Sequence, residues 1–172
     1  MKVQLTDEDL ATRGDRTYFA EGEHEVLIEK AERGTTDAGK EYVEFSVLGH
    51  ADERDTARLW FTTDASAKYA MSIMAGIAVH NKQTEAEKAS VRTAWKSITD
   101  TDKIDAKYLA NFKDKDAFFT VHQSERTYTT PSGETRHSYD KNIYGYMPKP
   151  KATTVQQDIL AAMPADISGQ PF

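Results

Sequence analysis

Aromatic and basic side chains occur together in two parts of this chain, and that combination suits the binding of unstacked bases. Tyr42, Arg58 and Trp60 occupy outward positions of two alternating segments. The later candidates are Arg126, Tyr128, Arg136, Tyr139 and Lys141. Each base stacked on an aromatic ring contributes about 1–3 kcal/mol, while cations follow the phosphates. The pattern predicts a sequence-tolerant site for single-stranded nucleic acid, although the same tyrosines also suit cross-strand pairs of a hairpin.

The segment Gly34–Lys40 resembles a phosphate-binding loop. Two further cations lie at its ends, Arg33 just before it and Lys40 as its last residue. The last position of the G-x-x-x-x-G-K-[ST] pattern is Glu41, where a hydroxyl group is needed for magnesium. The segment also connects two expected strands, so no helix N-terminus faces the anion. We interpret it as the connection of an antiparallel pair, with Arg33 and Lys40 available to phosphates.

None of the remaining motifs predicts a catalytic centre. The acidic run Asp100–Asp105 lacks the glycine and the final glutamate of a calcium loop. The five histidines are isolated, and the chain has no cysteine. A metal-dependent nuclease built on Asp52, Glu53 and Asp55 is a distant alternative, because these acids crowd one loop. The sequence predicts a protein that is not an enzyme and that has no cofactor and no metal.

Composition bounds the class of protein. The 172 residues carry a net charge of -6, and 10% of them are aromatic. The segment 113–151 is mildly basic, with seven Lys or Arg and five Asp or Glu, so the acidic excess lies elsewhere. A mean hydropathy of -0.68 argues against a membrane protein. An N-terminus without an apolar stretch and the lack of cysteine predict a cytoplasmic protein, in a host cell if phage-encoded.

The order of expected elements favours a small barrel. Alternating residues predict strands at 24–30, 41–48 and 56–62. Helical spacing follows from Asp64, the expected N-cap, to about residue 80, then over 84–98 and 104–112. Strands resume at 117–122 and in a hairpin, 126–130 and 134–139, that continues toward 143–146. Ile143, Tyr144 and Tyr146 are expected to close the core.

Three strands, helices and further strands are what a five-stranded OB-type barrel requires. We therefore predict a mainly β fold with helices between strands 3 and 4. The expected organisation is an N-terminal arm (1–17), an OB-fold domain (18–148) with a helical insertion (64–115), and a C-terminal tail (149–172). Other small barrels and an α+β sandwich remain open.

Two stretches carry a family resemblance. The run from Gly22 to Ala31 and the run Gly39-Lys-Glu-Tyr-Val-Glu-Phe-Ser-Val47 resemble the opening of phage OB-fold single-stranded-DNA-binding proteins. Residues 118–148, which include Gly133-Glu134 and Asn142-Ile-Tyr-Gly-Tyr-Met-Pro148, are similar to the closing hairpin of that family. The resemblance covers roughly residues 20–62 and 116–148. It implies single-stranded-DNA binding in phage DNA replication or recombination.

The last residues and the acidic charge suggest protein partners. The sequence ends in Pro171-Phe172, as do bacterial single-strand-binding proteins whose acidic tip docks replication and repair enzymes. This similarity implies that replication or recombination proteins bind the tail; a homo-oligomer is also compatible with the sequence. The alternative function is a protein-interaction module, in which an acidic phage protein docks a host replication or defence factor.

Overall fold

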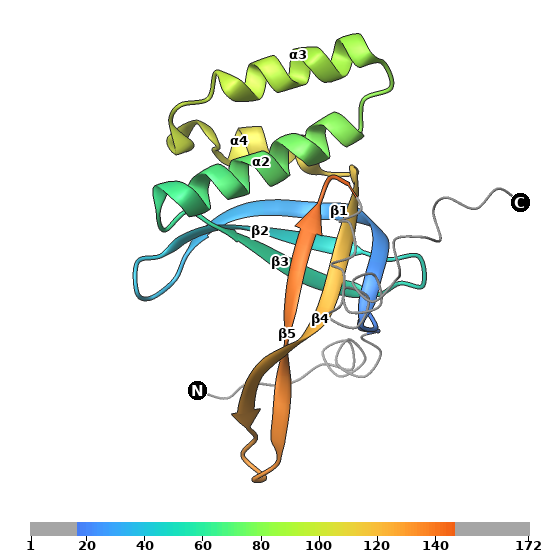
Figure 1. The fold of residues 1–172 in the computed structure, drawn as a ribbon, viewed down its shortest axis with the longest axis vertical. Helices are drawn as coiled ribbons and strands as arrows, with labels where there is room; N and C mark the ends of the chain where they lie inside the picture. Colours follow the sequence, from blue (N-terminus) through green and yellow to red (C-terminus); the bar gives the residue numbers. More distant parts are fainter. Residues whose placement is uncertain (1–16, 147–172) are drawn as a thin grey trace, which may run out of the picture.

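The computed structural model describes residues 17–146 and has a mainly β fold, drawn in Figure 1. Five antiparallel strands form one sheet, with helices between the third and fourth strands. The strands are β1 (Gly22–Thr35), β2 (Glu41–Leu48), β3 (Arg54–Trp60), β4 (Asp116–Thr129) and β5 (Thr135–Tyr144). The helices are α2 (Asp64–His80), α3 (Glu85–Lys96) and α4 (Ala106–Leu109), with the 3₁₀ turns η1 (Thr101–Lys103) and η2 (Ala110–Phe112). This confirms the predicted β-rich class and the place of the helices in the chain.

The strand order in the sheet is β3-β2-β1-β4-β5, so β1 lies at its centre. Hydrogen-bonded pairing ends at β3 on one side and at β5 on the other, which leaves the sheet open. The sheet nevertheless curls enough for its two edges to approach each other. Lys141 Nζ of β5 donates to Asp55 Oδ1 of β3 at 2.8 Å.

Alternation along the strands builds the core, because every second side chain points to the same face of a sheet. On β2, Val43, Phe45 and Val47 are fully buried while the residues between them are partly exposed. On β3, Leu59 is buried, whereas Arg58 and Trp60 point outward as the sequence predicts. The predicted facing of these side chains is therefore confirmed, although β3 runs from Arg54 to Trp60 and not over 56–62 as predicted.

Helix α2 covers one end of the curved sheet, and α3 lies beyond it (Figure 1). Four residues of α2 are buried in the core: Ala70, Ile73, Met74 and Ile77. The helix begins with a capping box in which the Thr63 hydroxyl accepts from the Ser66 amide and the Ser66 hydroxyl accepts from the Thr63 amide. Asp64 is therefore the first helical residue rather than the N-cap. None of the helices found within residues 17–146 is long and apolar enough to span a bilayer.

Several element boundaries differ from the prediction. Strand β1 continues to Thr35, where it pairs with Glu41, so Arg33 lies on a strand and not in the connecting turn. The turn is confined to residues 36–40, where Gly39 adopts a φ of +76° that favours glycine. Strands predicted as separate pieces at 117–122 and 126–130 form the single strand β4, with an irregularity in register between Gln123 and Thr127.

The expected closure of the core by the last tyrosines is correct only in part. Ile143 is fully buried and Tyr144 is half-buried, but the side chain of Tyr146 is exposed. Tyr146 comes after β5 has ended, so no strand alternation fixes its direction. The predicted tail (149–172), and all but residue 17 of the predicted arm, lie outside the described residues.

Candidate nucleic-acid interface

A cleft of about 450 Å³ lies between the two sheet edges and the start of α2, and we call it the β3–β5 cleft. Four predicted site residues line it: Arg58, Trp60, Arg126 and Lys141. Arg58 and Trp60 come from β3, whereas Arg126 and Lys141 come from the β4–β5 hairpin, more than 60 positions later in the sequence. The curled sheet therefore assembles one site from the two segments in which the sequence pairs aromatic with basic residues.

Trp60 belongs to a small cluster of flat groups on the outer face of β2 and β3. Cross-strand pairing places Tyr42 opposite Trp60, with ring centroids 5.3 Å apart. The Arg58 guanidinium lies 4.4 Å from the centre of the Tyr42 ring. One side of Tyr42 is thus occupied within the protein, whereas Trp60 keeps 37% of its surface exposed at the cleft. Of these two rings, Trp60 is the one that is exposed at the cleft.

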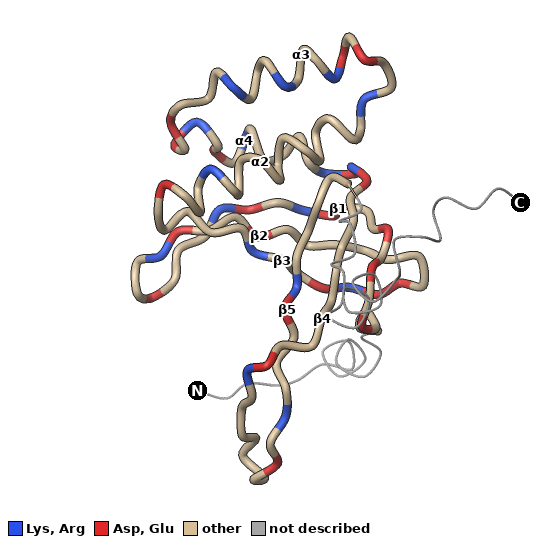
Figure 2. Tube along the Cα trace, viewed as in Figure 1, with Lys and Arg blue, Asp and Glu red and all other residues tan. Residues whose placement is uncertain are grey.

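The cations at the cleft are held by carboxylates of the same chain. Arg58 Nε donates to Glu44 Oε2 at 2.6 Å, and this hydrogen bond raises the pKa of the guanidinium. Arg126 Nη2 donates to Asp140 Oδ1 at 3.2 Å, in addition to the Lys141–Asp55 pair described above. Figure 2 shows that positions of both signs are interleaved along the strands. The cleft is therefore polar and close to neutral rather than strongly positive.

The far half of the β4–β5 hairpin extends away from the sheet as a two-stranded arm (Figure 1). It carries Tyr128 and Tyr139, whose side chains are 51% and 52% exposed. Tyr128 pairs across the hairpin with Arg136, whereas Tyr139 lies three residues further along β5. Because side chains alternate between faces, Arg136 with Tyr128 and Tyr139 with Lys141 occupy opposite faces of the arm.

The remaining predicted cations lie apart from the cleft. Arg33 Nη1 donates to the Thr101 carbonyl oxygen at 2.9 Å and Nη2 to Glu41 Oε2 at 3.1 Å, so the side chain joins β1 to the helical segment. Lys40 is exposed in the turn between β1 and β2. Arg136 Nη2 donates to Glu134 Oε2 at 2.7 Å near the hairpin turn. Pro171 and Phe172 lie outside the described residues.

The structure adds five cleft residues that the sequence analysis did not select as site residues: Leu59, Ser66, Tyr69, Asp140 and Asn142. Tyr69 projects from the first turns of α2 with 52% of its surface exposed. Burial, together with a hydrogen bond to Tyr69, raises the pKa of the neighbouring Tyr144 to about 12. The helical pattern identified the inner face of α2, but sequence alone offered no signal that an outer residue faces β5.

No protein-family model matches the chain, and a search of curated proteins finds no significant relative. Among residues 17–146, no group of three or more His, Asp or Glu side chains is placed to hold a metal ion.

Proposed function

We propose that the sheet is an OB-type barrel and that the protein binds single-stranded DNA across the β3–β5 cleft. The strand order supports the barrel, because an OB-fold is a partly open barrel of five strands in which the outer strands approach each other. The Lys141–Asp55 contact across the open edge supports it as well. The resemblance to phage OB-fold proteins suggests a role in phage DNA replication or recombination.

The observation that carries the proposal is the exposed indole of Trp60 at the mouth of a cleft that also contains Arg58, Arg126 and Lys141. A base stacked on Trp60 would place its phosphates near these three cations. Tyr69 offers a second ring on the helix side of the same cleft. Stacking is tolerant of sequence because every base has a flat face, so no hydrogen-bond code is needed.

The internal ion pairs set the expected character of binding. DNA phosphates must compete with Glu44, Asp55 and Asp140 for the cleft cations. Counterion release is therefore small, because these cations are already neutralised in the free protein. Stacking then supplies most of the affinity, and the dependence on salt is shallow for a protein of this class.

A titration with fluorescein-labelled oligo-dT of about 15 nucleotides tests the proposal, since one OB-fold covers roughly 4–16 nucleotides. The Trp95→Phe variant leaves Trp60 as the single tryptophan, and its fluorescence should be quenched on binding. Trp95 is buried against Tyr108 and Phe112 in the helical segment, so it is a poor reporter in the native chain. The proposal would be overturned if, at low salt, the oligo-dT caused no quenching of Trp60 fluorescence and no change in anisotropy.

A further inference from the structure

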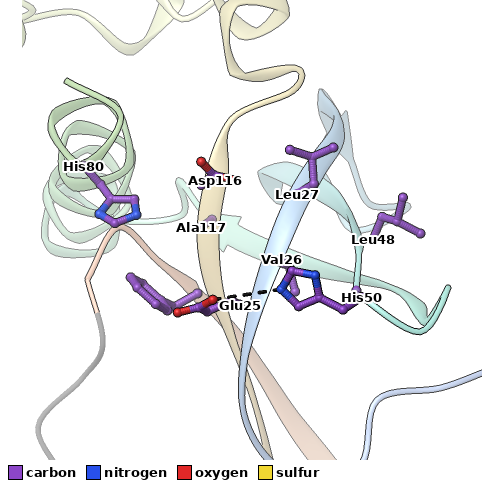
Figure 3. Close-up of a pocket in the computed structure, with 10 residues that line it drawn as sticks. Glu25, Val26, Leu27, Leu48, His50, His80, Asp116 and Ala117 are labelled. Carbon is purple, nitrogen blue, oxygen red and sulfur yellow. Dashed lines mark ion pairs between the residues drawn. The ribbon is translucent and has the colours of Figure 1, made fainter. Parts of the chain in front are cut away.

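A second hollow, of about 610 Å³, lies on a different part of the molecule (Figure 3). It is formed by β1, the beginning of β4, the loop after β2, and His80 at the last position of α2. The β3–β5 cleft adjoins the other end of the same helix, at Ser66. Since an α-helix rises about 1.5 Å per residue, the two ends of α2 are roughly 25 Å apart. A ligand in this hollow would not occupy the DNA site.

The hollow has an apolar floor. Leu27, Leu48 and Phe118 line it and are only half-buried, beside the buried Val26 and Ala117. Figure 3 shows Leu27 and Leu48 on one flank and His80 on the other. The ring of His80 packs against that of Phe118, with centroids 5.2 Å apart. These side chains provide a surface that an apolar anchor of a partner would cover.

Carboxylates surround this floor. Glu25 and Asp116 line the hollow, and Glu25 and His50 also line an adjoining hollow of about 400 Å³ that adds Glu23 and Glu53. Hydrogen bonds from the backbone amides of Glu53 and Ala51 lower the pKa of Glu53, which keeps it anionic at neutral pH. Within the part of the chain that the structure describes, no Lys or Arg lines either hollow. We call the joined pair the β1–β4 groove.

We propose that the β1–β4 groove docks a basic amphipathic peptide segment of a partner protein. Aliphatic side chains of this peptide would cover Leu27, Leu48 and Phe118. Its lysines or arginines would contact the carboxylates of the groove, which are Glu23, Glu25, Glu53 and Asp116. An anionic nucleic acid is repelled by the same carboxylates, so this surface is distinct from the DNA site. The inference does not depend on DNA binding. It gives a location to the protein-interaction role that the acidic composition suggests.

The test uses the full chain and a short fluorescein-labelled peptide of repeated Leu-Lys-Lys units, followed by fluorescence anisotropy. The double variant Glu25→Gln/Asp116→Asn should weaken binding about fivefold, because each exposed ion pair contributes modestly. The matched control Asp37→Asn/Glu125→Gln removes the same charge outside the groove and should leave the affinity unchanged. A Ser-Lys-Lys peptide should bind about tenfold more weakly, because it lacks the apolar anchor.

Amide chemical shifts on adding the Leu-Lys-Lys peptide should change at Val26, Leu27, Leu48 and Phe118. Three results would overturn the proposal: no binding of the peptide, equal weakening by the control variant, or equal binding of the Ser-Lys-Lys peptide. Shifts that move at these residues on simple dilution of the protein, without peptide, would identify a second copy as the occupant and would also overturn it.

Discussion

At the scale of single residues, Trp60 differs from the other aromatic candidates because it is exposed at a hollow surface. Tyr42 already contacts Trp60 and the Arg58 guanidinium, which gives it a supporting role. Tyr128 and Tyr139 are exposed on an arm, where they also suit the cross-strand contacts of a hairpin. Exposure alone therefore does not rank the candidates, whereas exposure beside three cations does.

The Trp60→Ala substitution should reduce the affinity for oligo-dT by about 1–3 kcal/mol, which corresponds to roughly 5- to 150-fold. The loss follows from removal of the stacking surface, and anisotropy with labelled oligo-dT measures it. Tyr18→Ala removes an exposed ring that does not line the cleft and serves as the matched control. If both variants bind alike, the indole does not stack a base.

Tyr144 gives a prediction of pH dependence. Its pKa in the fold is about 12, above the ordinary value of about 10, because burial and the hydrogen bond with Tyr69 favour the neutral phenol. The raised pKa contributes stability that is fully present below about pH 10 and is lost as the pH rises toward 12. Thermal unfolding followed over this range should show that the native protein loses stability more steeply than Tyr144→Phe.

At the scale of elements, two glycines face each other where α2 contacts the residue that follows β5. A Cβ atom added at Gly145 would overlap the backbone of Gly76 and Ile77 in α2. One added at Gly76 would meet Tyr146 and Gly145 only at ordinary distances of 3.8–3.9 Å. The two positions are close in space, yet only Gly145 requires the absence of a side chain.

Gly145→Ala should therefore destabilise the protein by about 1–3 kcal/mol, because backbone atoms of α2 have to move. Gly76→Ala should stabilise it by about 0.5–1 kcal/mol, because alanine favours the helix interior. Urea unfolding of both variants measures the pair. Equal effects of the two substitutions would contradict the close packing of α2 on residue 145.

The elements were predictable where local alternation decides them. Strand β2 was predicted with its observed bounds, because Val43, Phe45 and Val47 alternate with polar or half-exposed residues. Strand β1 was predicted too short because Arg33, Gly34 and Thr35 are typical turn residues, whereas pairing with β2 keeps them extended. Strand β4 was predicted as two pieces because the register irregularity between Gln123 and Thr127 interrupts the alternation.

The candidate site was less predictable than the strands. Its aromatic and basic residues were found from their types, but the contacts of those residues depend on how the sheet curls. The Lys141–Asp55 pair joins residues 86 positions apart, and only the approach of β5 to β3 creates it. The same holds for Tyr69, because sequence periodicity distinguishes the two faces of α2 without identifying what the outer face meets.

At the scale of the whole molecule, two exposed ion pairs offer a way to trace the proposed path of single-stranded DNA. Asp140 neutralises Arg126 at the cleft, whereas Glu134 neutralises Arg136 next to the hairpin turn. Both pairs are exposed, so neither adds much to folding stability. Removing either carboxylate frees one cation for a DNA phosphate. The effect on DNA binding then depends on whether the DNA strand reaches the freed cation.

An oligo-dT of about six nucleotides is near the short end of what a single OB-fold covers. For this oligonucleotide, Asp140→Asn should tighten binding and Glu134→Gln should leave binding unchanged. A cation that newly contacts a phosphate adds about 0.7 to the slope of log K against log salt for single strands. The Asp140→Asn slope should therefore be steeper than that of the native protein by about this amount. Tighter binding of both variants would instead place the strand along the arm, with Arg136 among its contacts; tighter binding of neither would remove the β3–β5 cleft from the path.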